Sequence, residues 1–158
     1  MATKISVIIP TYAPKDYLWE CLGSLENQTL SKDEFEVILV LNGEREPYES
    51  LIQKKLPEYS FNSTLLYSTP NGVSRARNLG MDKAQGCYIC FIDDDDWVSD
   101  NYLAELLSNA CDNGIVEANV KDVDEQTREE SEQHFLSRAY KNYQPEKESS
   151  RFANRSFF

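Results

Sequence analysis

Residues 88–97 read YICFIDDDDW, so that five apolar or aromatic residues lead directly into four aspartates and a tryptophan. A short, continuous apolar run is typical of a strand that is buried on both faces of a parallel sheet. The four carboxylates then lie at the carboxyl end of that strand, and open α/β sheets bind their ligands at this edge. The stretch predicts a buried parallel strand with a ligand site at its end.

The four adjacent carboxylates need compensation, because they repel one another and lose water beside an apolar strand. A hard divalent cation would provide it. If the backbone stays extended, Asp93 and Asp95 point to the same side, and a ligand set made only of oxygens favours Mg2+ or Mn2+. Such an ion would also bind a diphosphate. The alternative is a polar loop before a helix, with Ser99 or Asp100 as N-cap, which explains one or two acidic residues but not four.

Apolar segments of strand type and of helix type alternate over the first 120 residues. The expected strands span residues 5–9, 35–41, 64–67, 87–92 and, as a candidate fifth, 115–120. The first expected helix begins after Pro14. Three further helices are expected at residues 48–56, 73–85 and 101–110. This order predicts the α/β class, with a mostly parallel sheet flanked by helices.

The character of the chain changes after the candidate fifth strand. Residues 1–122 are expected to form the α/β core, and residues 123–158 a polar linker, an amphipathic helix and a tail. Residues 124–133 contain almost no apolar side chain and should be solvated, as a loop or as a weak helix. Residues 135–143 carry a helical apolar stripe that would serve a missing domain or a homodimer. The chain stops at Phe157-Phe158 like a domain cut part-way, as if only a remnant of a second region were present.

The composition excludes several classes of function. A length of 158 residues fits one domain, and a formal net charge of −11 opposes general attraction to nucleic acid or to anionic lipid. Neither a secretory leader nor an apolar run of about 20 residues is present, so a cytoplasmic protein without a transmembrane segment is expected. Cysteines 21, 87, 90 and 111 lie inside apolar stretches and are expected to be reduced and buried.

Arg77 lies on the apolar stripe of the expected helix 73–85. The stripe contains Val73, Ala76, Arg77, Gly80 and Ala84. An arginine on a buried face is costly without a partner. Near the first turns of a helix it can hold an anion or a base edge together with backbone N–H groups, or it can form a structural ion pair. Arg75 and Asn78 lie on a different face.

Three motifs stand in order along the chain: SVIIPTY at residues 6–12, GVSRARNLG at residues 72–80 and FIDDDDW at residues 91–97. Together they resemble family 2 glycosyltransferases with the GT-A fold, a Rossmann-like fold, over roughly the first 120 residues. The resemblance implies a nucleotide-diphosphate-sugar donor across the carboxyl ends of the strands, with Mn2+ or Mg2+ between protein carboxylates and diphosphate. It also implies transfer to a hydroxyl of a glycan or lipid-linked glycan in polysaccharide biosynthesis, with inversion.

The resemblance assigns roles in nucleotide binding. Thr11 would lie near the base, and Arg77 near the base or the diphosphate. After the second strand the family usually has an acidic residue followed by Asp or Asn and Gly, whereas this chain reads Leu41-Asn42-Gly43. Leu41 thus replaces a base-contacting carboxylate, which leaves the nucleotide open. Asn42 is a candidate for the donor site, or it forms only a tight turn with Gly43.

The resemblance also assigns the acidic run. Asp95 would bind the metal as the second aspartate of the D-x-D pattern, and Asp93 would lie near the ribose or sugar and on the metal side. Asp94 would belong to the donor site, and Asp96 would face the donor sugar or the acceptor as a catalytic contact. The family places its general base downstream, often in a Glu-Asp pair. No such pair follows Trp97, so the base is unassigned.

Two other hypotheses remain beside a glycosyltransferase. One is a truncated, non-catalytic module that binds a nucleotide sugar. The other is a phosphoryl-transfer enzyme that uses the acidic run as nucleophile and magnesium site, although it lacks a downstream lysine and hydroxyl constellation. A dinucleotide oxidoreductase is disfavoured, because residues 10–14 read PTYAP in place of a glycine-rich phosphate loop.

Overall fold

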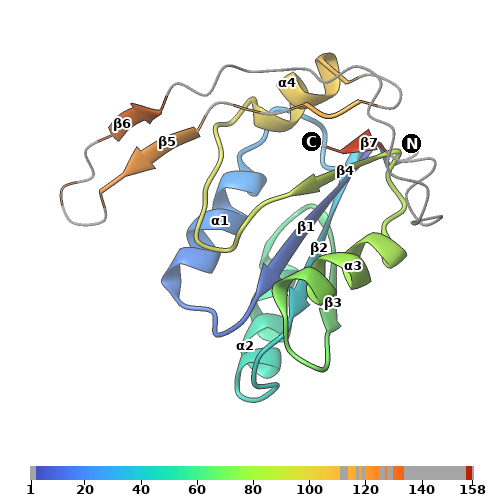
Figure 1. The fold of residues 1–158 in the computed structure, drawn as a ribbon, viewed down its shortest axis with the longest axis vertical. Helices are drawn as coiled ribbons and strands as arrows, with labels where there is room; N and C mark the ends of the chain where they lie inside the picture. Colours follow the sequence, from blue (N-terminus) through green and yellow to red (C-terminus); the bar gives the residue numbers. More distant parts are fainter. Residues whose placement is uncertain are drawn as a thin grey trace.

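The main sheet runs through the centre of the molecule, with α1 (Asp16–Glu26) on one side of it and α3 (Val73–Lys83) on the other (Figure 1). The computed structural model describes residues 3–110, 114–116, 118, 120–124, 127, 130–133 and 156–157. The main sheet has the order β3-β2-β1-β4-β7, and all its neighbours are parallel. Its strands are β1 (Ile5–Thr11), β2 (Phe35–Leu41), β3 (Asn62–Tyr67), β4 (Tyr88–Phe91) and β7 (Ser156–Phe157). The helices are α1 (Asp16–Glu26), α2 (Tyr48–Lys55), the short 3-10 helix η1 (Leu56–Glu58), α3 (Val73–Lys83) and α4 (Tyr102–Ser108).

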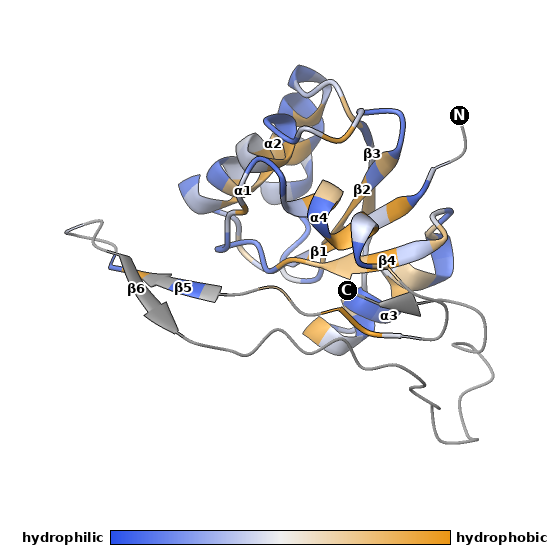
Figure 2. Ribbon diagram, turned by 90° about the horizontal axis from the view of Figure 1, so that it is seen from above, coloured by the Kyte–Doolittle hydropathy of each residue, from blue (hydrophilic) through white to orange (hydrophobic). Residues whose placement is uncertain are grey.

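Helices cover both faces of this sheet. Ile5, Val7 and Ile9 of β1 pack in one cluster with α1, α2 and α4, whereas Ile8 packs in a second cluster with α3. Figure 2 shows α3 on one side of the apolar strands and the other three helices on the opposite side. All seven residues of β1 and all seven of β2 are buried. The prediction of an α/β fold with strands covered on both faces is therefore confirmed.

Helix α3 packs closely on β1, because Gly80 has no side chain at the contact. A Cβ atom at Gly80 would lie 2.5 Å from Cγ2 of Ile8, well inside van der Waals contact. The close approach fixes the helix over the sheet, and Arg77 is one turn earlier on the same helix. The small residue thus sets how far the Arg77 side chain stands from the strand ends.

The prediction of a fifth strand at residues 115–120 was wrong. The strand there is β5 (Val120–Val123), and it pairs antiparallel with β6 (Glu130–Gln133) in a separate two-stranded sheet. Residues 130–133 are also not the loop or weak helix that was expected. Their sequence is wholly polar, and since backbone hydrogen bonds form a ladder without apolar side chains, the pattern gave no signal.

The edge of the main sheet beside β4 is covered by β7, which comes from the C-terminal end of the chain. Ser156 pairs with Tyr88 and Phe157 with Ile89, so that β7 extends the sheet. A strand of two residues has no periodicity that a sequence pattern can reveal. The expected helical stripe at residues 135–143, with the homodimer inferred from it, lies outside the described residues. It stays a prediction, as does the boundary between residues 122 and 123.

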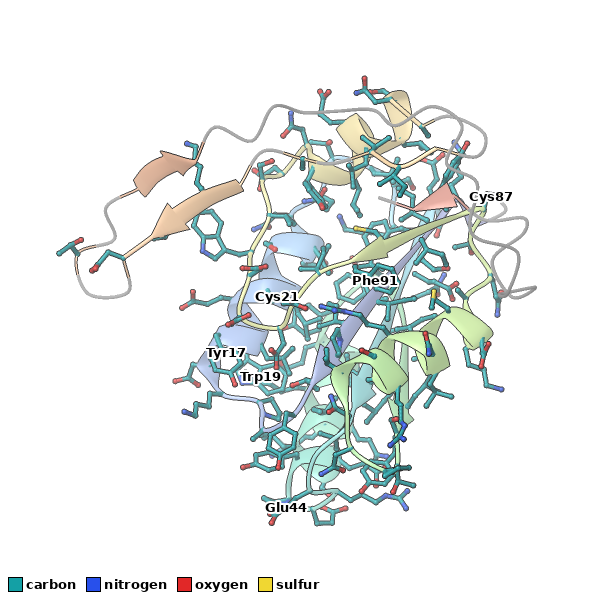
Figure 3. All side chains as sticks on the ribbon, viewed as in Figure 1. Tyr17, Trp19, Cys21, Glu44, Cys87 and Phe91 are labelled. Atoms are coloured by element: carbon teal, nitrogen blue, oxygen red, sulfur yellow. The ribbon has the colours of Figure 1, made fainter. Side chains whose placement is uncertain are left out.

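The cysteines are only partly as expected. Cys21 and Cys90 are buried and free, and burial raises the pKa of the Cys90 thiol to about 12. Cys87 is exposed, since it precedes β4 and lies at the margin of the sheet (Figure 3). The prediction that it is buried was wrong, whereas Cys111 lies outside the described residues. In the part of the chain that the structure describes, no helix has the length and apolarity needed to cross a membrane.

Candidate active site

The carboxyl ends of three neighbouring strands meet where the chain order reverses. From β1 the chain continues through α1 to β2 on one side, whereas β4 lies on the other side of β1. A crevice forms at such a switch point because the connections leave the sheet in opposite directions, and open α/β sheets bind ligands there. Thr11 is the last residue of β1, Asn42 is the first residue after β2, and Asp93 is the second residue after β4.

A cavity of about 610 Å³ opens at this edge. Its walls come from four separate parts of the chain. They are Pro10 and Tyr12 around the end of β1, Asn42 after β2, residues 71–73 with Arg77 at the start of α3, and residues 93–95 after β4. The donor-site candidates at positions 42, 77, 93, 94 and 95 thus line one cavity. Thr11 is not one of the lining residues, but its hydroxyl donates a hydrogen bond to Asp94, which is.

The four aspartates have four different surroundings. Asp93 forms an ion pair with Arg77, with 2.5 Å between Oδ1 and Nη2. Asp94 accepts a hydrogen bond of 2.5 Å from the Thr11 hydroxyl. Asp95 lines the cavity, and no described side chain is paired with its carboxylate. Asp96 does not line it, so the structure places Asp96 beside the donor cavity and not in it.

The acidic run is a turn and not an extended segment. The backbone N–H of Asp96 donates to the carbonyl oxygen of Asp93 at 3.1 Å, which closes a four-residue turn. Alternation with period two therefore does not apply, and the condition on which Asp93 and Asp95 were expected to share a side was wrong. They nevertheless line the same cavity, because the turn presents three successive carboxylates to it.

Burial and neighbouring charges raise the pKa values of two residues of the acidic run, Asp94 and Asp96. Burial raises the pKa of Asp94, the Thr11 hydrogen bond partly lowers it again, and the charge of Asp95 adds to the rise. Burial likewise raises the pKa of Asp96, with further contributions from Asp95 and Asp93. A cation in the cavity would offset this repulsion.

The carboxylates of the cavity suit a metal ion whose coordination shell is completed by oxygens of a bound ligand. No three His, Cys, Asp or Glu side chains converge on a metal position within the described residues. Asp95 and Asp93 offer carboxylate oxygens at the cavity wall, and Asp95 has no competing partner among the described side chains. Magnesium-like ions are commonly held by one or two carboxylates together with substrate phosphates. The residues therefore fit an ion bound jointly with a diphosphate.

Arg77 forms an ion pair with Asp93, which was one of its two expected roles. One of its N–H donors, on Nε, has no hydrogen-bond partner among the described residues. Its guanidinium carbon lies 5.9 Å from the centre of the Phe91 ring on β4, which Figure 3 shows beside α3. The Nε atom is itself buried. A buried donor without a partner is costly, and this one belongs to a side chain that lines the cavity.

Asn42 holds the end of β1 as well as lining the cavity. Its backbone N–H and its side-chain amide both donate to the carbonyl oxygen of Thr11, at 2.8 and 3.0 Å. A Cβ at Gly43 would lie 2.1 Å from the Tyr12 carbonyl oxygen, so the turn requires glycine. The tight-turn interpretation of Asn42 and its place in the cavity wall therefore hold together.

Several lining residues were missed from the sequence. Tyr12 is 58% exposed and Val73 is 47% exposed, and both face the cavity with Asn71 and Gly72. Val73 was expected on the buried stripe of α3, but it lies in the first turn, beyond the edge of the sheet. The turn dipeptide Asn71-Gly72 was the available signal, because it places the start of α3 at the same edge as the strand ends.

Comparison with known proteins decides the family. The family model of Glycosyl transferase family 2 matches residues 6–158. The chain belongs to glycosyltransferase family 2. Within this family it is 34% identical over 103 residues to the glycosyltransferase GlyA of Streptococcus pneumoniae, a match that covers 65% of this chain and 14% of GlyA.

Solved glycosyltransferase structures show the same fold. The structure of residues 1–349 of Staphylococcus aureus TarS in complex with UDP-GlcNAc superposes with a TM-score of 0.64 at 27% identity, covering 72% of this chain and 34% of that one. The mannosyltransferase PcManGT of Pyrobaculum calidifontis, in complex with GDP-Man and Mn2+, gives a TM-score of 0.62 at 21% identity, covering 76% and 36%. The second likeness concerns the fold alone. The GT-A fold expected from the motifs is confirmed, and the chain spans a minor part of the relatives that it matches.

Proposed function

We propose that this family 2 chain is the donor-binding part of an enzyme that transfers a sugar from a nucleotide diphosphate to a hydroxyl of a glycan or lipid-linked glycan, in the cytoplasm. The observation that carries the proposal is the cavity at the switch point, which three carboxylates line together with the start of α3 and Arg77. The likeness to TarS, whose structure contains UDP-GlcNAc, supports a nucleotide-sugar donor.

The diphosphate would lie between Arg77 and the acidic run. The Arg77 guanidinium and the backbone N–H groups in the first turn of α3 would donate to phosphate oxygens, and the helix dipole favours the negative charge. Asp95, with Asp93, would hold Mn2+ or Mg2+, which when bound neutralises charge on the departing diphosphate. Thr11, Asn42 and Tyr12 stand at the β1 and β2 ends, where the nucleoside would lie, and Asp94 fixes the turn through Thr11.

The stereochemical part of the proposal is a single displacement with inversion. Asp96 lies just outside the donor cavity, at a position from which it would contact the donor sugar or the acceptor. The general base stays unassigned, because no Glu-Asp pair follows Trp97 in the sequence.

Calorimetric titration tests the donor site. UDP-, GDP- and dTDP-sugars are titrated into the chain with Mn2+ and, separately, with EDTA. We expect at least one of them to bind with Mn2+, and the affinity to fall roughly 10- to 100-fold without metal or in the Asp95→Asn variant. Asp82→Asn, which alters an exposed aspartate on α3, is the matched control and should bind like wild type. Binding that ignores both the metal and Asp95→Asn would sink the proposal.

A donor-binding module without transfer is the second candidate. It needs only the donor cavity that the described residues form. The two candidates differ in one measurement, the release of free nucleotide from the bound donor in the presence of glycan acceptors. Release that depends on acceptor supports the enzyme, whereas metal-dependent binding with no release supports the module.

A further inference from the structure

A second cavity, of about 710 Å³, lies on the other side of the acidic run from the donor cavity. Helix α1 lines it with Glu20, Gly23 and Asn27, the segment after the acidic run lines it with residues 97–100, and Val123 of β5 completes the lining. Hereafter this cavity is the Trp97 groove. Asp95 lines the donor cavity and Trp97 lines the groove, so only Asp96 separates the two along the chain.

Hydrogen bonds hold the wall of the Trp97 groove to α1 and to the residues after it. The backbone N–H of Val98 donates to the Ser24 hydroxyl at 3.1 Å. The side-chain amide of Gln28 donates to the Ser99 carbonyl oxygen at 2.7 Å, and the backbone N–H of Thr29 donates to that of Asp100 at 2.7 Å. The groove is thus formed before any ligand enters, and a preformed site loses less entropy on binding.

Gly23 leaves the floor of the groove open. It lies inside α1, where glycine is destabilising relative to alanine. Close contact explains Gly43, Gly80 and Gly86, and a φ of 147° explains Gly72, but a Cβ at Gly23 would meet no atom within 4 Å. Packing therefore does not require glycine at this position, and a larger side chain would take up space in the groove that Gly23 lines.

Trp97 gives the groove its chemistry. Its side chain is 47% exposed, although a large aromatic residue gains most from burial. An open indole face flanked by carboxylates and an amide matches a sugar ring, which offers apolar C–H groups on its face and hydroxyl donors around its rim. None of the described lining residues is basic, and Glu20 and Asp100 are acidic. With a net charge of −11 for the chain, the groove disfavours a polymer that carries phosphodiester charges.

We propose that the Trp97 groove binds an uncharged glycan as acceptor, with a sugar ring stacked on Trp97 and its hydroxyls bonded to the flanking carboxylates and to Asn27. The inference rests on the proposed function, because in the chain only Asp96 separates Asp95, which lines the donor cavity, from Trp97, which lines the groove. It adds the chemical class of the acceptor and the residues that select it.

Tryptophan fluorescence reports on the groove directly. The chain has two tryptophans, and Trp19→Phe leaves Trp97 as the sole emitter. This variant is saturated with UDP and Mn2+ and titrated with cellotetraose, N-acetylchitotetraose, mannotetraose and a β-galactotetraose, and separately with an oligo(glycerol phosphate) of similar length. We expect a saturable change in emission with at least one neutral oligosaccharide and a weaker or absent change with the anionic one.

Two variants separate the groove from the fold. By calorimetry, Trp97→Ala and Gly23→Leu should each weaken binding of the neutral oligosaccharide by roughly tenfold or more, while Trp97→Phe keeps most of it. Gly23→Leu fills the groove and improves helix propensity, so loss of binding cannot come from unfolding. The proposal fails if no neutral oligosaccharide binds, if Gly23→Leu binds like wild type, or if the anionic oligomer binds more tightly. If one of these outcomes occurs while UDP with Mn2+ still binds to wild type and to the variants, only the assignment of the groove is wrong. If UDP with Mn2+ does not bind to any of them, the proposed function is wrong.

Discussion

Arg77 links the acidic run to α3 at the residue scale, and its structural and ligand roles can be separated. The side chains of the Arg77–Asp93 pair are 34% and 52% exposed, so the pair should contribute only about 0–1 kcal/mol to stability. A charge-assisted hydrogen bond to a diphosphate is worth about 1.5–3 kcal/mol. The two effects therefore differ enough in size to be told apart by one substitution.

Arg77→Ala should weaken binding of the nucleotide sugar by roughly 10- to 100-fold while it lowers the free energy of unfolding by at most about 1 kcal/mol. Calorimetry with the donor and urea denaturation give the two numbers. Arg75→Ala removes an exposed arginine from the same helix and should change neither. A large loss of stability with unchanged affinity would mean that the ion pair is purely structural.

Asp96 gives a prediction about pH. Because its pKa is raised in the folded state, mainly by burial and then by Asp95 and Asp93, the folded protein holds this proton more tightly than the unfolded chain. The stabilising contribution is full below the ordinary aspartate pKa of about 3.9 and is lost as pH rises through the folded pKa. Asp96→Asn should therefore be more stable than wild type at pH 7, and the gain should vanish at low pH.

Urea denaturation of Asp96→Asn without metal, from pH 7 downward, checks this expectation, with Asp82→Asn measured in parallel. Equal behaviour of the two variants at pH 7, or a destabilised Asp96→Asn, would contradict it.

At the scale of the element, the contact between α3 and β1 sets the width of the donor cavity. Gly80 and Ile8 form that contact, and Arg77 is carried on the same helix one turn earlier. A shift of α3 away from the sheet would therefore also shift Arg77 relative to Asp93. Packing and donor affinity should be coupled through this one glycine.

Gly80→Ala should destabilise the protein by about 1–3 kcal/mol through overpacking, although alanine is the better helix former. It should also weaken donor binding. Gly23→Ala is the matched control, since its new Cβ meets no atom within 4 Å, and it should stabilise α1 by about 0.5–1 kcal/mol. Thermal unfolding of both variants decides between them. Two changes of the same sign and size would show that helix propensity and not the contact governs Gly80.

At the scale of the whole molecule, the donor cavity joins segments that are far apart in sequence. Residues 10–12, 42, 71–77 and 93–95 meet only when the sheet has formed. A ligand that binds this assembly binds the folded state alone, and so it raises the free energy of unfolding by mass action.

UDP with Mn2+ at about 100 times its dissociation constant should add about 2.7 kcal/mol, and so raise the Tm by roughly 5–10 °C for a chain of this length. Differential scanning fluorimetry measures the shift. Mn2+ alone and UDP alone should each give less than the pair, and Asp95→Asn should lose the extra shift of the pair. Additive shifts in wild type would argue that metal and nucleotide bind at separate places.

Much of the fold could be predicted because local patterns of apolar residues determine its strands and helices. The runs SVIIPT and FEVILVL are continuous and apolar, as a strand buried on both faces must be, and the order of strands and helices then restricts the sheet to a parallel one. The acidic run after β4 and the arginine on α3 could be assigned to one edge for the same reason. Polar β6 and two-residue β7 carried no such pattern, since only backbone pairing with distant segments defines them.

The sequence by itself therefore determined the fold class, the edge of the sheet that carries the site, and the residues 11, 42, 77 and 93–96 as its candidates. The tertiary structure alone decided how the four aspartates differ: one is held by Arg77, one by Thr11, one faces the cavity without a partner, and one stands between two cavities. The physical reason is that the charge state and the contacts of a carboxylate depend on the groups that surround it in space. Those neighbours are Thr11 of β1 and Arg77 of α3, which are 83 and 16 residues away in the chain from the aspartates that they hold and adjacent to them only in the folded protein.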